Sequence, residues 1–109
     1  MIVVKNQLAA SFLVTAAFHI PSANAADPTK GKSLFMSVGC YACHGTVGQG
    51  ATPTGPRLAP NPPPLEAFLK ELRSPRNVMP PYAERLLPDA AVADIRAYLA
   101  AIRPPPQRP

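Results

Sequence analysis

The sequence predicts a small all-α domain, and three observations support this fold class. Apolar residues recur at helical spacing in three segments, near residues 28–38, 65–73 and 88–102. No segment shows the alternation of apolar and polar residues that is typical of a half-buried strand. Most of the 16 prolines lie outside these segments, and proline fixes φ and removes a backbone donor. We therefore expect one domain of about three helices joined by proline-rich loops.

The first 25 residues have the three parts of a secretory signal peptide. Lys5 gives a positive start, residues 8–20 form an apolar run, and Ala23 and Ala25 are the small residues expected before a cleavage site. The run is shorter than the roughly 20 residues needed to span a bilayer, although an uncleaved membrane anchor is the alternative. Cleavage near Ala25 would leave 84 of the 109 residues as a periplasmic protein without stable membrane insertion.

The first helix is predicted from Pro28 to about Val38. Asp27 is a good N-cap, and Pro28 is a good first helical residue. Gly39 is placed to end the helix as a left-handed cap. The predicted buried face consists of Gly31, Phe35 and Val38.

Directly after this helix stands Cys40-Tyr41-Ala42-Cys43-His44, which holds both cysteines of the chain. Cys-x-x-Cys-His is typical of c-type haem attachment. Residues three apart on a helical turn project to the same side, so both sulfurs can reach the vinyl groups of one porphyrin, with His44 as proximal iron ligand. A zinc site would lack its second ligand pair, and a thioredoxin-like dithiol would not need the histidine; both stay open as alternatives. One covalent haem c would also supply the core that 84 residues can hardly build alone.

The loop after His44 shows neither helical nor strand periodicity, and residues 53–64 contain six prolines. Such a segment can be ordered at reduced entropic cost. We expect it to wrap around one face of the haem, and a flexible linker is the alternative.

Two further helices follow. The first begins near residue 65 and ends at Ser74-Pro75. The second runs from about Pro88 to Ile102, and Asp89 in its first turn and Arg103 after its last both suit the helix dipole. The apolar stripe of the earlier helix is Leu65, Phe68, Leu69 and Leu72. That of the later helix is Ala91, Val92, Ile95, Tyr98, Leu99 and Ile102.

The second axial position of the iron decides the function. Met1 leaves with the signal peptide, and Met36 lies on the same side of the chain as His44, where we expect it to pack. Met79 is the candidate ligand, because Pro80 biases it away from the helical region and stiffens its segment. The alternative is a core methionine under a loop.

Ligation of iron by His44 and Met79 leaves no labile site for substrate and raises the reduction potential. The predicted function is therefore one-electron transfer between periplasmic redox partners, or service as the haem subunit of a dehydrogenase, rather than catalysis. Two other classes stay open. One is a haem enzyme, peroxidase-like or ligand-binding, in which Met79 is displaced; the other is a haem-free thiol or metal module.

These residues resemble class I (mitochondrial-type) monohaem cytochromes c in their small bacterial periplasmic form. The resemblance covers residues 28–102. It rests on the Cys40-to-His44 motif and on three further segments, Gly55-Pro56-Arg57-Leu58, Met79-Pro80 and Ala97-Tyr98-Leu99. It implies the small cytochrome c fold, with helices and proline-rich loops wrapped around one covalently attached haem.

The resemblance also implies two contacts. The carbonyl of Pro56 would accept a hydrogen bond from Nδ1–H of His44 and so hold the ring. The first and last helices would cross where Gly31 and Phe35 meet Tyr98. We place the cytochrome c domain at residues 26–103 and a proline-rich tail at residues 104–109.

The formal charge is +5, and it becomes +4 when Lys5 leaves with the signal peptide. This net positive charge favours partner proteins with acidic docking surfaces, such as a dehydrogenase or a terminal oxidase. No basic run interleaved with aromatics is present, so nucleic-acid binding is not expected. The lysines that ring the haem edge in the best-known relatives are missing, because only Lys30, Lys32 and Lys70 remain after cleavage.

Overall fold

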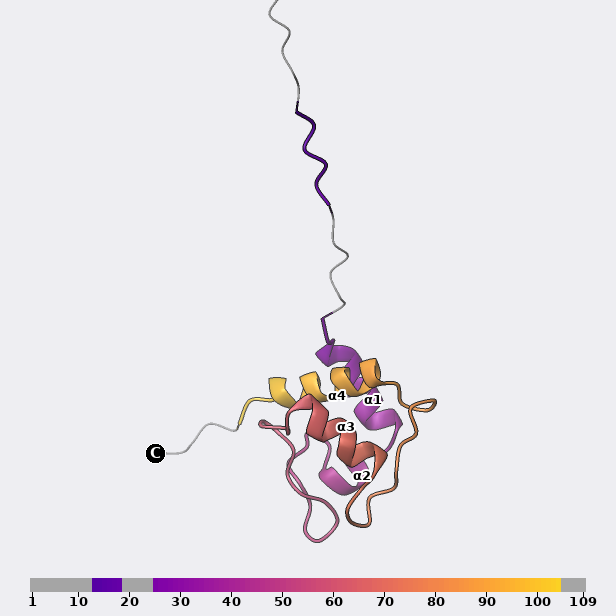
Figure 1. Cartoon of the computed structure of the whole chain (residues 1–109). Helices are drawn as coiled ribbons and strands as arrows, with labels where there is room; N and C mark the ends of the chain where they lie inside the picture. The colour runs from indigo at the N-terminus through magenta and orange to yellow at the C-terminus, as the bar shows by residue number, and fades with distance from the viewer. Residues whose placement is uncertain (1–12, 19–24, 105–109) are drawn as a thin grey trace, which may run out of the picture.

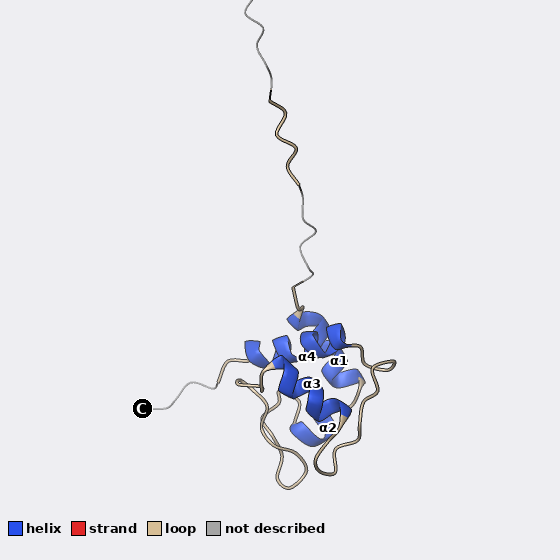
Figure 2. Ribbon diagram, in the orientation of Figure 1, coloured by secondary structure: helices blue, strands red, loops and turns tan. Residues whose placement is uncertain are grey.

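The computed structural model describes residues 13–18 and 25–104, and these residues contain four helices. In chain order they are α1 (Pro28–Ser37), α2 (Tyr41–His44), α3 (Leu65–Arg73) and α4 (Asp89–Ala101) (Figure 1). The described residues contain no strand (Figure 2), and one isolated antiparallel bridge pairs Ala51 with Gly55. The all-α prediction is confirmed. The helix beyond the predicted three is α2, a single turn at the Cys-x-x-Cys-His motif.

Helices α1 and α4 cross in close contact, as the resemblance implied. A Cβ on Gly31 would overlap the backbone carbonyl of Asp94 and would lie 2.9 Å from Cβ of Tyr98. One turn later, the rings of Phe35 and Tyr98 pack with centroids 5.6 Å apart and planes tilted by 59°. The absence of a side chain at residue 31 therefore lets the two backbones meet.

Both ends of α1 are fixed as the sequence predicted. The carboxylate of Asp27 accepts from the backbone N–H of Thr29 (2.8 Å) and of Lys30 (3.2 Å). At the other end Gly39 has φ +88°. The N–H of Gly39 reaches the carbonyl of Met36, and the N–H of Cys40 reaches that of Phe35. This pair of bonds is a Schellman cap, and it turns the chain directly into the cysteine motif.

The core lies among α1, α3, α4 and the loops that join them. Helix α3 contributes Phe68, Leu69 and Leu72 of its predicted apolar stripe, whereas Leu65 is exposed. The helix ends at Arg73, with Ser74 as its C-cap. The buried apolar side chains are Phe35, Ala59, Phe68, Leu72, Leu87, Val92, Ile95, Tyr98 and Leu99. Most of them belong to the predicted stripes, and Ala59 and Leu87 are added by the two long loops.

The proline-rich loop between α2 and α3 is held by hydrogen bonds. The carbonyl of Gly48 accepts from Leu58 N–H (2.8 Å) and Ala59 N–H (3.0 Å). Gly48 itself packs so closely on α4 that a Cβ there would lie 2.6 Å from Leu99. Nε of Arg96 on α4 donates to the carbonyl of Pro63 (2.6 Å). These contacts contradict a flexible linker and favour the ordered loop.

The predicted signal peptide and tail lie largely outside the described residues. Of residues 1–25 the structure describes residues 13–18 and Ala25, all of them exposed, and of residues 104–109 it describes Pro104. Among the described residues, no helix is long and apolar enough to cross a membrane. Cleavage near Ala25 therefore stays a prediction.

Candidate functional site

The cysteine motif forms one helical turn, as its spacing predicted. Cys40 has helical dihedrals at the N-cap of α2, and the N–H of His44 donates to its carbonyl (3.0 Å). Both cysteines are free thiols; Cys40 is half-buried and Cys43 is exposed. In the view of Figure 1, α2 lies at one end of the molecule, and the loops 45–64 and 74–88 descend toward that same end.

The two thiols differ in their surroundings. Burial raises the pKa of the Cys40 thiol to about 11, although a backbone hydrogen bond acts in the opposite direction. Cys40 also packs against the apolar core. At neutral pH its sulfur is therefore protonated and sits in an apolar setting, which suits a thioether bond to an apolar macrocycle.

His44 is buried, and the loop after α2 fixes its ring. Its Nδ1 lies 2.8 Å from the carbonyl oxygen of Pro56, and its exposed fraction is 9%. A carbonyl can only accept, so Nδ1 carries the proton and donates it. The lone pair is then on Nε2, the nitrogen that is free to bind a metal. The contact that the resemblance implied for Pro56 is present.

Gly55 and Thr54 bring Pro56 to this position. A Cβ at Gly55 would lie 2.6 Å from the carbonyl oxygen of Cys43 and 3.0 Å from His44 Nδ1. Thr54 Oγ1 lies 3.1 Å from that same Cys43 oxygen and 3.0 Å from Ala51 O. The loop is thus fastened to the motif on both sides of residue 55. Sequence reasoning missed Thr54, and no local pattern marks it.

Tyr82 brings the loop between α3 and α4 to the cysteine motif. Its pKa is raised by burial first and then by the charges of Cys40 and Cys43 as thiolates. Its hydroxyl donates to the carbonyl of Val38 (2.9 Å), just ahead of the motif.

The two internal methionines lie in different environments. Met79 is half-buried and packs against the core, as both an iron ligand under a loop and a core methionine would. Met36 is 37% exposed on α1, so the expectation that it packs was wrong. Ligation by Met79 stays a prediction, and Met36 is available as a control residue.

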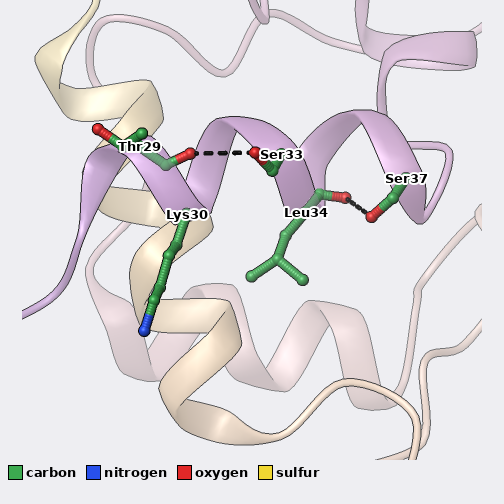
Figure 3. A pocket seen from close by; sticks show the side chains of 5 residues that line it. All are labelled: Thr29, Lys30, Ser33, Leu34 and Ser37. Atoms are coloured by element: carbon green, nitrogen blue, oxygen red, sulfur yellow. Dashed lines mark hydrogen bonds between the residues drawn. The ribbon is translucent and has the colours of Figure 1, made fainter.

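A pocket along α1 is a separate feature. It is lined by Thr29, Lys30, Ser33, Leu34 and Ser37, all from this one helix (Figure 3). The hydroxyls of Ser33 and Ser37 donate to the carbonyls of Thr29 (3.4 Å) and Leu34 (3.2 Å). None of the predicted haem-binding residues lines it, so this pocket is a surface feature of α1.

The donor set fits a covalently attached haem. Two free thiols lie one helical turn apart, and a buried histidine next to them holds its proton on Nδ1. A zinc module fits less well. Within residues 13–18 and 25–104, no group of three or more His, Cys, Asp or Glu side chains is placed to hold a metal ion.

Residues 26–99 match the model of a protein family described as "Cytochrome C oxidase, cbb3-type, subunit III". The matched range contains every predicted site residue, from Cys40 to Met79, and the helix crossing at Tyr98. No curated protein gives a significant match to the chain.

Proposed function

Because the chain belongs to the family of cytochrome c oxidase, cbb3-type, subunit III, and is thus a c-type cytochrome with covalent haem c, we propose that it is a one-electron carrier. The bound haem supplies an iron that takes up and gives back single electrons. Membership of this family implies electron transfer through the haem. We further propose His44 and Met79 as axial ligands, a class I form and periplasmic partners.

In this proposal Cys40 and Cys43 hold the haem through thioether bonds, and His44 binds the iron through Nε2. The observation that carries it is the 2.8 Å contact between His44 Nδ1 and the Pro56 carbonyl. It fixes the tautomer and the ring orientation before any ligand is bound. Histidine ligands generally depend on such an outer partner for orientation and basicity.

Met79 is the second axial ligand in this proposal. Its support is the half-buried place of the side chain against the core and the two prolines that follow it, which restrict the loop. With both axial positions filled by side chains, no open coordination site is left for a substrate. The protein then moves electrons and is not an enzyme.

The partners are proposed to be exported redox proteins, such as a dehydrogenase or a terminal oxidase with an acidic surface. The net positive charge of the chain supports faster encounter with such a surface. Contacts of this kind are small and transient. Raising the ionic strength should therefore slow electron transfer.

The test uses the full chain, produced in a host that matures c-type cytochromes. The ferric protein should show the weak red absorption band of methionine bound to iron. Met79→Ala should abolish the band, and Met36→Ala, which changes an exposed methionine, should keep it. A band that survives Met79→Ala would assign the ligand elsewhere. Fast binding of cyanide or carbon monoxide to the unmodified protein would favour the haem-enzyme alternative.

A further inference from the structure

We propose that Arg73 is a positioning residue for Met79: its guanidinium clamps the loop of residues 74–88 and so sets how readily Met79 leaves the iron. The inference rests on the proposed ligation by Met79. It deepens that proposal, because it names the side chain that keeps the ligand in place.

Arg73 is the last residue of α3, and it contacts three points further along the chain. Its Nη1 donates to the carbonyl of Tyr82 (2.9 Å), and its Nη2 donates to the carbonyl of Leu87 (2.9 Å) and to Oδ1 of Asp89 (2.6 Å). These partners lie 9, 14 and 16 residues away in sequence. One side chain thus ties the end of α3 to the middle of the loop, to the buried Leu87 near the end of the loop and to the start of α4. The loop is the orange segment between α3 and α4 in Figure 1.

Met79 itself lies between two anchored points of this loop. On one side Arg76 binds the carboxylate of Glu71 through its backbone N–H and its Nε, with a side chain that is 83% exposed. On the other side Tyr82 donates its N–H to Leu72 O (2.8 Å) and its hydroxyl to Val38 O (2.9 Å). Residues 77–81, all of which the structure describes, make no hydrogen bonds between these anchors.

The position of the Met79 thioether therefore depends on the two anchors. The bonds that hold the anchor at Tyr82 are less exposed to solvent than those that hold the anchor at Arg76. The Arg73 side chain is 24% exposed, so its bonds are screened less than those of the exposed Arg76. The guanidinium presents its donors in a planar fork. That fork lets one group hold two carbonyls and a carboxylate, which the single ammonium of a lysine would match only in part. Loss of Arg73 would leave the Tyr82 and Leu87 carbonyls without this charged donor.

A weaker clamp makes the form with Met79 released more populated. An exogenous ligand can reach the iron only in that form, so its apparent affinity scales with the population of that form. Hydrogen bonds to a charged group are among the stronger ones. Losing those of Arg73 should therefore raise the apparent affinity for an added ligand about ten- to a hundredfold.

The experiment is an imidazole titration of the ferric full-chain holoprotein, followed by the loss of the red methionine band. We expect Arg73→Gln to bind imidazole about ten- to a hundredfold more tightly than the wild type and Arg73→Lys to fall between them. Arg96→Gln is the matched control, because Arg96 also donates to a loop carbonyl, that of Pro63 (2.6 Å), in the other loop. The imidazole affinity of Arg96→Gln should stay within about twofold of that of the wild type.

Hydrogen exchange of the Tyr82 amide in the same holoproteins gives a readout that does not depend on the iron. The Tyr82 amide proton, which is bonded to Leu72 O, should exchange faster in Arg73→Gln than in the wild type. Its exchange rate should be unchanged in Arg96→Gln. If Arg73→Gln does not fold, Arg73→Lys and Asp89→Asn, which removes one acceptor of the clamp, should show the same effects at smaller size.

The outcomes separate the two proposals. A wild type without the methionine band would overturn ligation by Met79 and the clamp with it. A wild type with the band, combined with unchanged imidazole affinity in Arg73→Gln, would overturn the clamp alone. An equal gain in Arg73→Gln and Arg96→Gln would show general loosening of the fold and would also overturn the specific role of Arg73.

Discussion

Gly55→Ala should loosen the histidine side of the haem site. The added Cβ would lie 2.6 Å from the carbonyl oxygen of Cys43 and 3.0 Å from His44 Nδ1, whereas ordinary contacts begin near 3.4 Å. Both atoms belong to α2, whose turn is closed by its own hydrogen bonds. The loop must therefore move away by several tenths of an ångström, and it takes the Pro56 carbonyl with it.

The expected loss of folding stability follows from this displacement of the loop. Overpacking typically costs about 1–3 kcal/mol, and a weakened hydrogen bond between His44 and Pro56 accounts for about 1 kcal/mol of it. In a domain of this size a loss of about 1 kcal/mol lowers Tm by about 4–8 °C, so we expect a fall of roughly 5–20 °C. The backbone at Gly55 does not have positive φ, so the effect comes from the contact and not from backbone strain.

Two assays check this prediction: thermal unfolding of the holoprotein and an equilibrium measurement of its reduction potential. A histidine that donates less strongly to Pro56 is a less basic ligand and stabilises the ferric state less. The potential of Gly55→Ala should therefore rise, by an amount on the order of tens of millivolts, since about 59 mV corresponds to a tenfold change for one electron.

Thr54→Ser is the control, because it keeps the hydroxyl that lies 3.1 Å from Cys43 O, and it should change stability by less than about 0.5 kcal/mol. Wild-type Tm and potential in Gly55→Ala would refute the argument that this loop holds the histidine.

Three further predictions concern the scaffold. Gly31→Ala should lower the free energy of unfolding, measured by chemical denaturation, by about 2–4 kcal/mol, because the added Cβ overlaps a carbonyl of α4. The control Ser33→Ala, on the exposed side of α1, should change it by less than about 0.5 kcal/mol. Equal effects of the two substitutions would contradict the helix contact. Asp27→Ala should cost about 1 kcal/mol through loss of the N-cap, and no change in the unfolding midpoint would speak against the cap. The backbone N–H and side chain of Arg76 lower the pKa of Glu71 below its usual 4.5, so the ionised form favours the fold. Glu71→Gln should therefore be less stable than wild type at neutral pH and equal to it once the pH falls below the lowered pKa; a difference that grows in acid would be the wrong sign.

Much of the scaffold could be predicted because its signals are local. Capping residues, glycine positions and apolar spacing placed the ends of α1 and α4 within a residue or two of where they lie. Gly39 ends α1 as expected, since a left-handed residue there favours glycine. The resemblance added two contacts that no local rule provides: Gly31 and Phe35 against Tyr98, and Pro56 against His44. Both are present.

The remaining features depend on which distant residues meet. Arg73 lies in the last turn of α3, yet its partners lie up to 16 residues away. The hydroxyl of Thr54 reaches a carbonyl of α2 only because the loop folds back on the motif. Met36 was expected to pack and is exposed, because the core takes Gly31 and Phe35 from α1 and leaves the face of residue 36 outward. No spacing rule in the sequence decides these contacts.

The intact mass of the purified holoprotein, with mapping of the modified peptide, tests the central claim most directly. We predict a mature chain carrying one haem on the peptide that contains Cys40 and Cys43, with neither thiol open to alkylation. A chain of unmodified mass, colourless and with two alkylatable thiols, would contradict the account.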